Sequence, residues 1–143
     1  MGVSVEPFKT EDAFTLLEDP RLAHVRAYMT EERMAHLETN NLSFSLKRDG
    51  KLLCIAGIAP LWPNVGEGWA IFAKDVKENF LEIHKIVKKF IKESDFNRVQ
   101  MTVKFGFYEG HRWARLLGFE LECPRMKHYL PTGEDVSMYV VIK

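Results

Sequence analysis

The chain has 143 residues, a formal net charge of zero, and a composition that is 46% hydrophobic and 28% charged. These values are typical of a globular protein and predict one domain over residues 1–143. A neutral balance argues against a general nucleic-acid binder, which carries a basic surplus. Cys54 and Cys123 lack the spacing of a metal site, and no apolar window reaches the roughly 18 residues of a membrane helix. With no secretory signal at the start, we expect a soluble, cytoplasmic protein without a metal.

Two helices are predicted near the start of the chain, after a short strand over residues 3–8. Thr10 can cap the first helix, whose inward face would carry Ala13, Phe14 and Leu17. Residues 21–28 are ambiguous but favour a helix. Another helix is expected to start at Thr30 and to run to about residue 39, with Met34 and Leu37 facing inward.

A β-hairpin is predicted next. Residues 42–47 alternate strictly between polar and apolar, and Asp49-Gly50 is typical of a tight turn in which both residues have positive φ. The returning strand, 51–59, is apolar on both faces, which favours a place in the centre of the sheet. We expect a loop over 60–66 and a further strand over 67–73.

The longest predicted helix covers residues 75–93. Apolar residues recur along it at intervals of three and four: Phe80, Ile83, Val87, Phe90 and Ile91. Lysines gather in its second half, where they suit the negative end of the helix dipole: Lys85, Lys88, Lys89 and Lys92. With Arg98 they could serve a nucleic-acid module, but a solvated helix face is the simpler interpretation.

The last third of the chain predicts a strand over 98–103, a helix over 109–117 and a hairpin of strands 119–127 and 136–142. Gly118 directly follows the helix, where a left-handed cap belongs. The complete order predicts an α+β fold with a mixed, mostly antiparallel sheet of about seven strands and about four helices.

This last third, with its helix ending in Leu117-Gly118-Phe119 before a closing hairpin, resembles the C-terminal half of the GNAT fold of acetyl-CoA-dependent N-acyltransferases. The order of elements is similar over nearly the whole chain. The opening sequence, Val5-Glu6-Pro7-Phe8-Lys9-Thr10-Glu11-Asp12-Ala13, is also similar to many GNAT N-termini. The resemblance implies transfer of an acetyl group from acetyl-CoA to an amine.

In the GNAT fold the fourth and fifth strands splay apart, and the fourth strand and the loop after it hold the cofactor. The resemblance implies five cofactor-binding residues here: Ile71, Phe72, Ala73, Lys74 and Lys77. Residues 71–78 contain neither the glycine nor the arginine usual in a GNAT phosphate loop. Asp75 and Glu78 have the spacing of a capping box, which would place carboxylates where the pyrophosphate is expected.

The resemblance also implies candidate catalytic residues. The tyrosine that protonates the departing thiolate in many GNAT enzymes aligns with Ala114. Tyr108 is an alternative proton donor, and His111 could take a proton from the amine or give one to the thiolate. Glu67, between two glycines, is the candidate general base, with Glu109 as a weaker alternative. Each has an ordinary alternative: Tyr108 as a rim tyrosine, His111 as a solvated residue in a first helical turn, and Glu67 as part of a bulge.

A second interpretation is a non-catalytic GNAT-like protein that acts through protein–protein contacts. Residues 109–115 with the following Leu-Gly-Phe resemble small GNAT-like proteins of tailed bacteriophages, some of them internal virion proteins. The partner would then be a host or virion protein in the host cytoplasm or the virion, instead of an amine substrate. The sequence leaves monomer and homodimer open. Six aromatic residues could form either an apolar groove for the acceptor substrate or a protein interface: Trp62, Trp69, Phe72, Phe105, Phe107 and Trp113.

Overall fold

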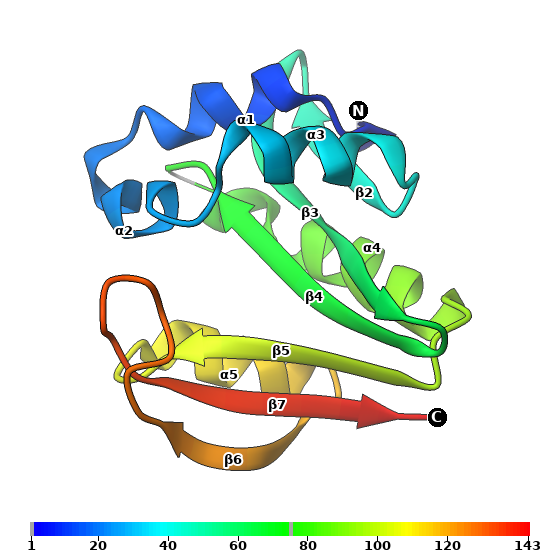
Figure 1. The fold of residues 1–143 in the computed structure, drawn as a ribbon. Coiled ribbons are helices and arrows are strands. Elements are labelled where there is room, and N and C mark those ends of the chain that lie inside the picture. The colour runs from blue at the N-terminus through cyan, green and yellow to red at the C-terminus, as the bar shows by residue number, and fades with distance from the viewer. Residues whose placement is uncertain (1, 75) are drawn as a thin grey trace.

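The computed structural model describes residues 2–74 and 76–143, whose strands form one sheet in the order β1-β2-β3-β4-β5-β7-β6 (Figure 1). Strands β4 and β5 run parallel, whereas the other neighbouring pairs are antiparallel. The strands are β1 (Ser4–Pro7), β2 (Ser43–Arg48), β3 (Lys51–Trp62), β4 (Val65–Phe72), β5 (Arg98–Lys104), β6 (Glu120–Met126) and β7 (Val136–Ile142). The predicted α+β class with a mostly antiparallel seven-stranded sheet is confirmed.

Helices cover both faces of this sheet (Figure 1). On one face lie α1 (Thr10–Leu17), the single-turn α2 (Ala23–Arg26) and α3 (Glu31–Thr39); on the other lie α4 (Phe80–Glu93) and α5 (Tyr108–Leu116). Strand β3 is buried on both faces, as predicted, because Ile55 packs in the α1–α3 core and Cys54 in the α4–α5 core. None of the described helices is long and apolar enough to cross a membrane.

Several local predictions are confirmed by the backbone. The Thr30 side chain accepts a hydrogen bond from the Arg33 amide and caps α3. Asp49 and Gly50 have φ of 51° and 79°, and Gly118 ends α5 with φ of 96°. On α4 the apolar stripe faces the core, with Ile83, Val87 and Ile91 buried.

Other local predictions are wrong. Lys9, not Thr10, is the N-cap of α1, and the Thr10 hydroxyl instead donates to Glu38 at 2.9 Å. Phe14 is 45% exposed, and Leu16 takes its place in the core beside Ala13 and Leu17, because the inward face of α1 is rotated by roughly 50° from the predicted one.

The segment 60–66 is not a loop. Strand β3 continues to Trp62 and β4 starts at Val65, so the connection is a tight turn with Asn64 at φ 72°. Helix α4 begins at Phe80, after a 3₁₀ turn at Lys77–Asn79. Residue Asp75, one half of the predicted capping box, lies outside the described residues.

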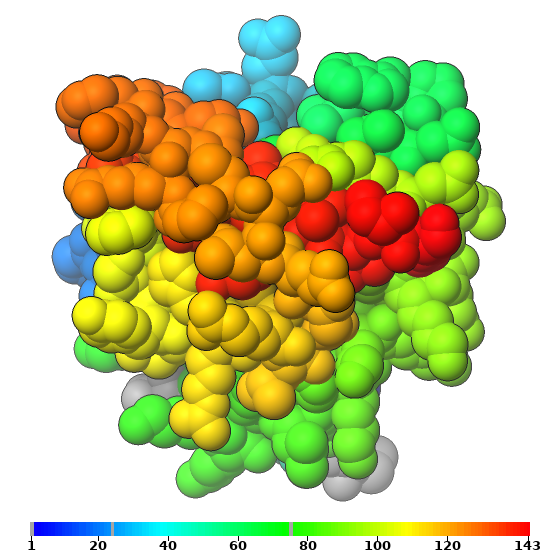
Figure 2. Space-filling view, turned by 90° about the horizontal axis from the view of Figure 1, so that it is seen from below, coloured from blue at the N-terminus to red at the C-terminus, as the bar shows by residue number. Residues whose placement is uncertain are grey.

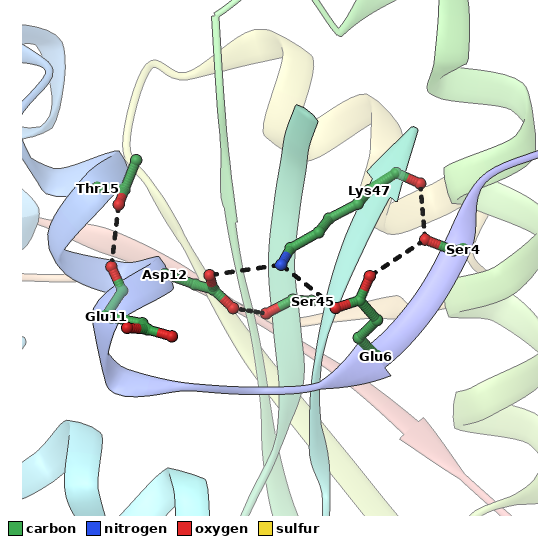
Figure 3. Close-up of polar contacts among 7 residues, drawn as sticks. All are labelled: Ser4, Glu6, Glu11, Asp12, Thr15, Ser45 and Lys47. Carbon is green, nitrogen blue, oxygen red and sulfur yellow. Dashed lines mark hydrogen bonds and ion pairs between the residues drawn. The ribbon is translucent and has the colours of Figure 1, made fainter. Parts of the chain in front are cut away.

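A polar cluster ties the N-terminal segment to the sheet (Figure 3). Asp12 on α1 accepts a hydrogen bond of 2.7 Å from the hydroxyl of Ser45, which is fully buried on β2. Lys47, two residues further along the same face, lies 3.8 Å from Asp12 and donates to Glu6 of β1 at 3.3 Å. These hydrogen-bonded carboxylates raise the pKa of Lys47. The Asp12 carboxylate and its neighbours therefore join α1 to β2 and, through Lys47, to β1.

Replacing Asp12 with Ala should reduce the free energy of unfolding by about 1–3 kcal/mol, since the buried Ser45 hydroxyl would lose its acceptor. Urea denaturation followed by circular dichroism measures this. Glu11→Ala is the matched control: its exposed carboxylate contacts neither Ser45 nor Lys47 in Figure 3, and its loss should change stability by about 0.5 kcal/mol or less. Equal losses in the two variants would contradict the assignment.

Candidate functional site

Strands β4 and β5 meet only at one end and then diverge. Their parallel pairing joins Val65–Glu67 to Arg98–Gln100 and goes no further. Beyond it, β4 remains paired with β3 as far as Phe72, and β5 remains paired with β7 as far as Lys104. The backbones of the two strands therefore diverge like a V in the middle of the sheet (Figure 1), as predicted, and the space between these backbones is called the slot below.

Peptide groups of both strands point into this slot. The amide of Ala73 donates to the Leu53 carbonyl at 2.8 Å, and in an antiparallel ladder the alternate residues, Ala70 and Phe72, direct their N–H and C=O groups to the opposite side. The same alternation applies to β5. Because the Phe105 amide donates to the Asp135 carbonyl at 3.0 Å on the β7 side, the peptide groups of Thr102 and Lys104 point the other way, toward the slot. Of the three strand residues predicted to hold the cofactor, only Phe72 turns its backbone into the slot, because Ile71 and Ala73 face β3.

Polar side chains line the slot on the face that carries α1–α3. Glu67 is half-buried there and accepts a 3.5 Å hydrogen bond from Gln100 across the junction of the two strands. Gln100 in turn accepts from Arg98 at 3.0 Å. Trp69, two residues along β4 on the same face, has a buried indole Nε1 for which the described residues provide no hydrogen-bond partner.

The charge of Glu67 contributes to the pKa of two tyrosines from distant segments. Burial raises the pKa of Tyr28, which follows α2, and the carboxylates of Glu134 and Glu67 add to the rise while Arg33 opposes it. Burial and then the Glu67 carboxylate raise the pKa of Tyr129, in the β6–β7 loop. Both pKa values are therefore raised, and the Glu67 carboxylate acts electrostatically on two tyrosines from different segments.

Aromatic side chains close the opposite face of the slot. The Phe72 ring lies 5.1 Å from the ring of Trp113 on α5, and Phe80 of α4 lies 5.7 Å from the same indole, each edge to face. The Trp113 Nε1 donates to His84 Nδ1 at 3.0 Å. A hollow of about 40 Å³ remains beneath them, bordered by Ala70 and other apolar groups. The slot is therefore polar on one face and aromatic on the other.

The start of α4 offers both signs of charge. Lys74 and Lys77 are exposed before the helix, whereas Glu78 and Glu82 lie at its start. The side chain of Asn79 is held by Arg48 at 2.9 Å. The two lysines can contact phosphate oxygens, but the 3₁₀ turn provides no glycine-rich backbone cradle.

The structure does not bring the three candidate catalytic residues together. Tyr108 is the first residue of α5 and is 80% exposed. His111 lies 2.8 Å from the Tyr139 hydroxyl through Nδ1, so it faces β7 while Trp113 faces β4. Glu67 is on the other face of the sheet from both. Tyr28, Tyr129 and Gln100 were not identified from sequence, since no local pattern relates their segments to Glu67.

The contact between His84 and Trp113 predicts a pH dependence of stability. Burial, with help from Lys88, lowers the pKa of His84, so the folded protein keeps this imidazole neutral where the unfolded chain protonates it. The free energy of unfolding should therefore fall as pH drops below about 6.5, until the lowered pKa is passed. Urea denaturation between pH 7.5 and 5 measures it.

His84→Gln keeps a carbonyl acceptor for the indole but has no group that titrates. It is therefore the matched control, because any pH dependence of stability that remains in this variant comes from other residues. Its stability should fall less between pH 7.5 and 5 than that of the wild type. Parallel pH profiles for the two proteins would contradict the assignment.

The fold is that of known acetyltransferases. A GNAT-family acetyltransferase from Bacillus anthracis is 17% identical, with a TM-score of 0.70 over 99% of this chain and 95% of that one. Ard1 from Thermoplasma volcanium is 11% identical, with a TM-score of 0.79 over 99% and 98% of the two chains. YncA, a putative acetyltransferase from Salmonella typhimurium solved with its cofactor acetyl-CoA, is 10% identical, with a TM-score of 0.73 over 99% and 94%.

At the level of sequence, no protein-family model and no curated protein matches the chain significantly. Structural similarity at identities of 10–17% over nearly complete chains establishes a common fold but does not assign roles to individual residues. The chain has the fold of the GNAT acetyltransferases.

Proposed function

We propose that the protein is an N-acyltransferase that moves an acetyl group from acetyl-CoA to an amine. One observation carries this proposal: a slot between two diverging parallel strands whose peptide groups at Ala70, Phe72, Thr102 and Lys104 have no strand partner. Those groups fit the amides of a pantetheine arm, and Lys74 and Lys77 fit its phosphates. The acetyltransferase names of the structural neighbours support the same activity.

The residues of the slot suit acyl transfer in distinct ways. Acetyl-CoA supplies an activated acyl thioester. A peptide N–H that points into the slot, from Ala70 or Phe72, can stabilise negative charge that develops on the acyl oxygen. Glu67 can take a proton from the amine as its nitrogen bonds to the acyl carbon and the carbon–sulfur bond breaks. The thiolate leaves without a dedicated acid, because Ala114 replaces the usual tyrosine.

The polar face of the slot is the proposed acceptor side. Glu67 accepts a hydrogen bond from Gln100 there, and Trp69 on the same face of β4 has a buried Nε1 without a partner among the described residues. On the aromatic face the indole N–H of Trp113 is already used, because it donates to His84. Tyr108 and His111 take no part in this arrangement.

Isothermal titration with acetyl-CoA tests the cofactor assignment. The wild type should bind, and reversing both charges in Lys74→Glu/Lys77→Glu should weaken binding roughly tenfold or more. Lys88→Glu/Lys89→Glu, two exposed lysines in the second half of α4, is the matched control and should bind like the wild type. Absence of heat and of any thermal shift at millimolar acetyl-CoA would overturn the proposal.

Glu67→Gln tests the general base. It should lower kcat/KM for acetylation of a panel of primary amines by about 10²-fold, since the amide cannot accept the amine proton. Release of the free thiol of coenzyme A provides the assay. The dissociation constant for acetyl-CoA should remain unchanged, and Glu120→Gln, on the exposed edge strand β6, should behave like the wild type. A variant with full activity would remove Glu67 from the mechanism.

A non-catalytic role through protein–protein contacts, as in the phage proteins, is the second candidate. The side chains of Phe72, Phe80 and Trp113 favour this second candidate, because their rings narrow from one face the slot in which a pantetheine arm would have to lie. Leu61 and Trp62 are 41% and 64% exposed at the β3–β4 turn and could meet a host or virion protein. Failure of acetyl-CoA binding together with co-purification of a partner that Trp62→Ala abolishes would favour this function over the first.

A further inference from the structure

A second groove lies on the side of α5 that faces away from the slot. Its volume is about 370 Å³, within the range of small-molecule sites. Phe105, Leu121 and Pro124 give it apolar walls, and Tyr108, His111 and Arg115 border it with polar groups. In Figure 2 atoms of β7, in red, are visible between the yellow start of α5 and the orange strand β6.

The floor of this groove is a fixed polar pair. Tyr139 is 1% exposed, and its hydroxyl lies 2.8 Å from His111 Nδ1. Because the tyrosine is packed in the core, the histidine ring is held in one orientation. When Tyr139 donates to Nδ1, Nε2 of the ring carries the remaining hydrogen and is left as a donor.

Charge makes the groove selective. The Arg115 guanidinium carbon lies 6.0 Å from the centroid of the Tyr139 ring. Within residues 2–74 and 76–143 no carboxylate is found paired with Arg115, and no aspartate or glutamate lines the groove. A guanidinium beside an apolar wall and without a counter-ion favours an anion, and its planar fork matches a carboxylate.

We propose that this groove binds a small carboxylate with an aromatic or branched apolar body. The carboxylate pairs with Arg115, and the body packs against Phe105 and Leu121. This site is separate from the β4–β5 slot, because His111 and Trp113 project from opposite sides of α5. The inference does not rest on the proposed transferase activity.

Two-dimensional ¹H–¹⁵N NMR with phenylacetate as the probe tests the proposal. Saturable shifts are expected at the amides of Gly106 and Leu121 and at the side-chain Nε of Arg115. Phenylacetamide keeps the ring but lacks the charge, and acetate keeps the charge but lacks the ring. Each should bind at least roughly tenfold more weakly than phenylacetate. Shifts confined to the slot residues Ala70 and Phe72, or no shifts at tens of millimolar probe, would overturn it.

Arg115→Gln should weaken phenylacetate binding by about tenfold or more. Arg112→Gln is the matched control, since Arg112 is exposed on the same helix but outside the groove, and it should bind like the wild type. Unchanged thermal melting shows that both variants are folded. Equal binding by the two variants would show that Arg115 does not recognise the carboxylate and would overturn the proposal.

Discussion

The junction between β4 and β5 is the contact on which the rest of the molecule depends. It joins the two halves of the sheet through three pairs of parallel residues, Val65–Glu67 with Arg98–Gln100. Gly66 lies at its tightest point, because a Cβ on this residue would come within 2.4 Å of Ile58 Cγ2. A side chain there would force the packed side chains of Ile58 and Phe96 to shift. Packing at the apex of the slot therefore favours a glycine.

The slot has an energetic consequence for the backbone. Strands β4 and β5 each keep an antiparallel partner on their outer side, so neither can satisfy its inner peptide groups by shifting register. Unpaired peptide groups inside a sheet are costly when they are dry, and water or a ligand must satisfy those of Ala70, Phe72, Thr102 and Lys104. Among the described residues the fold thus leaves a row of peptide groups near Glu67 without a strand partner, and this is the physical basis of the proposed binding function.

The sequence predicts well what short-range geometry decides. The order of elements, the apolar stripe of α4 and the positive φ of Gly118 follow from residues within one or two turns of one another. The loop predicted over residues 60–66 is wrong, because Pro60 pairs with Gly66 inside a long hairpin that turns only at residues 63 and 64.

The candidate site could be predicted only in part, because it is assembled across the whole chain. Glu67 is a prediction from its place in β4, whereas Tyr28 and Tyr129, 101 residues apart, are related to it only by the electrostatic effect of its carboxylate in the folded chain. Nothing in the local sequence of either tyrosine distinguishes it from a rim residue. The backbone groups of the slot are invisible to sequence patterns, because every residue has them.

Helix α5 explains why the polar residues singled out before Leu-Gly-Phe do not reach the slot. Successive residues on an α-helix are separated by about 100°, so His111 and Trp113 lie some 200° apart. With the indole directed at Phe72, the imidazole must face Tyr139 and β7. One helix thus places an apolar wall on the slot and a polar, cationic edge on the second groove. In the proposed mechanism acyl transfer in the slot uses strand amides and Glu67, because Ala114 offers no proton donor, and the polar residues of α5 serve the ligand proposed for the second groove.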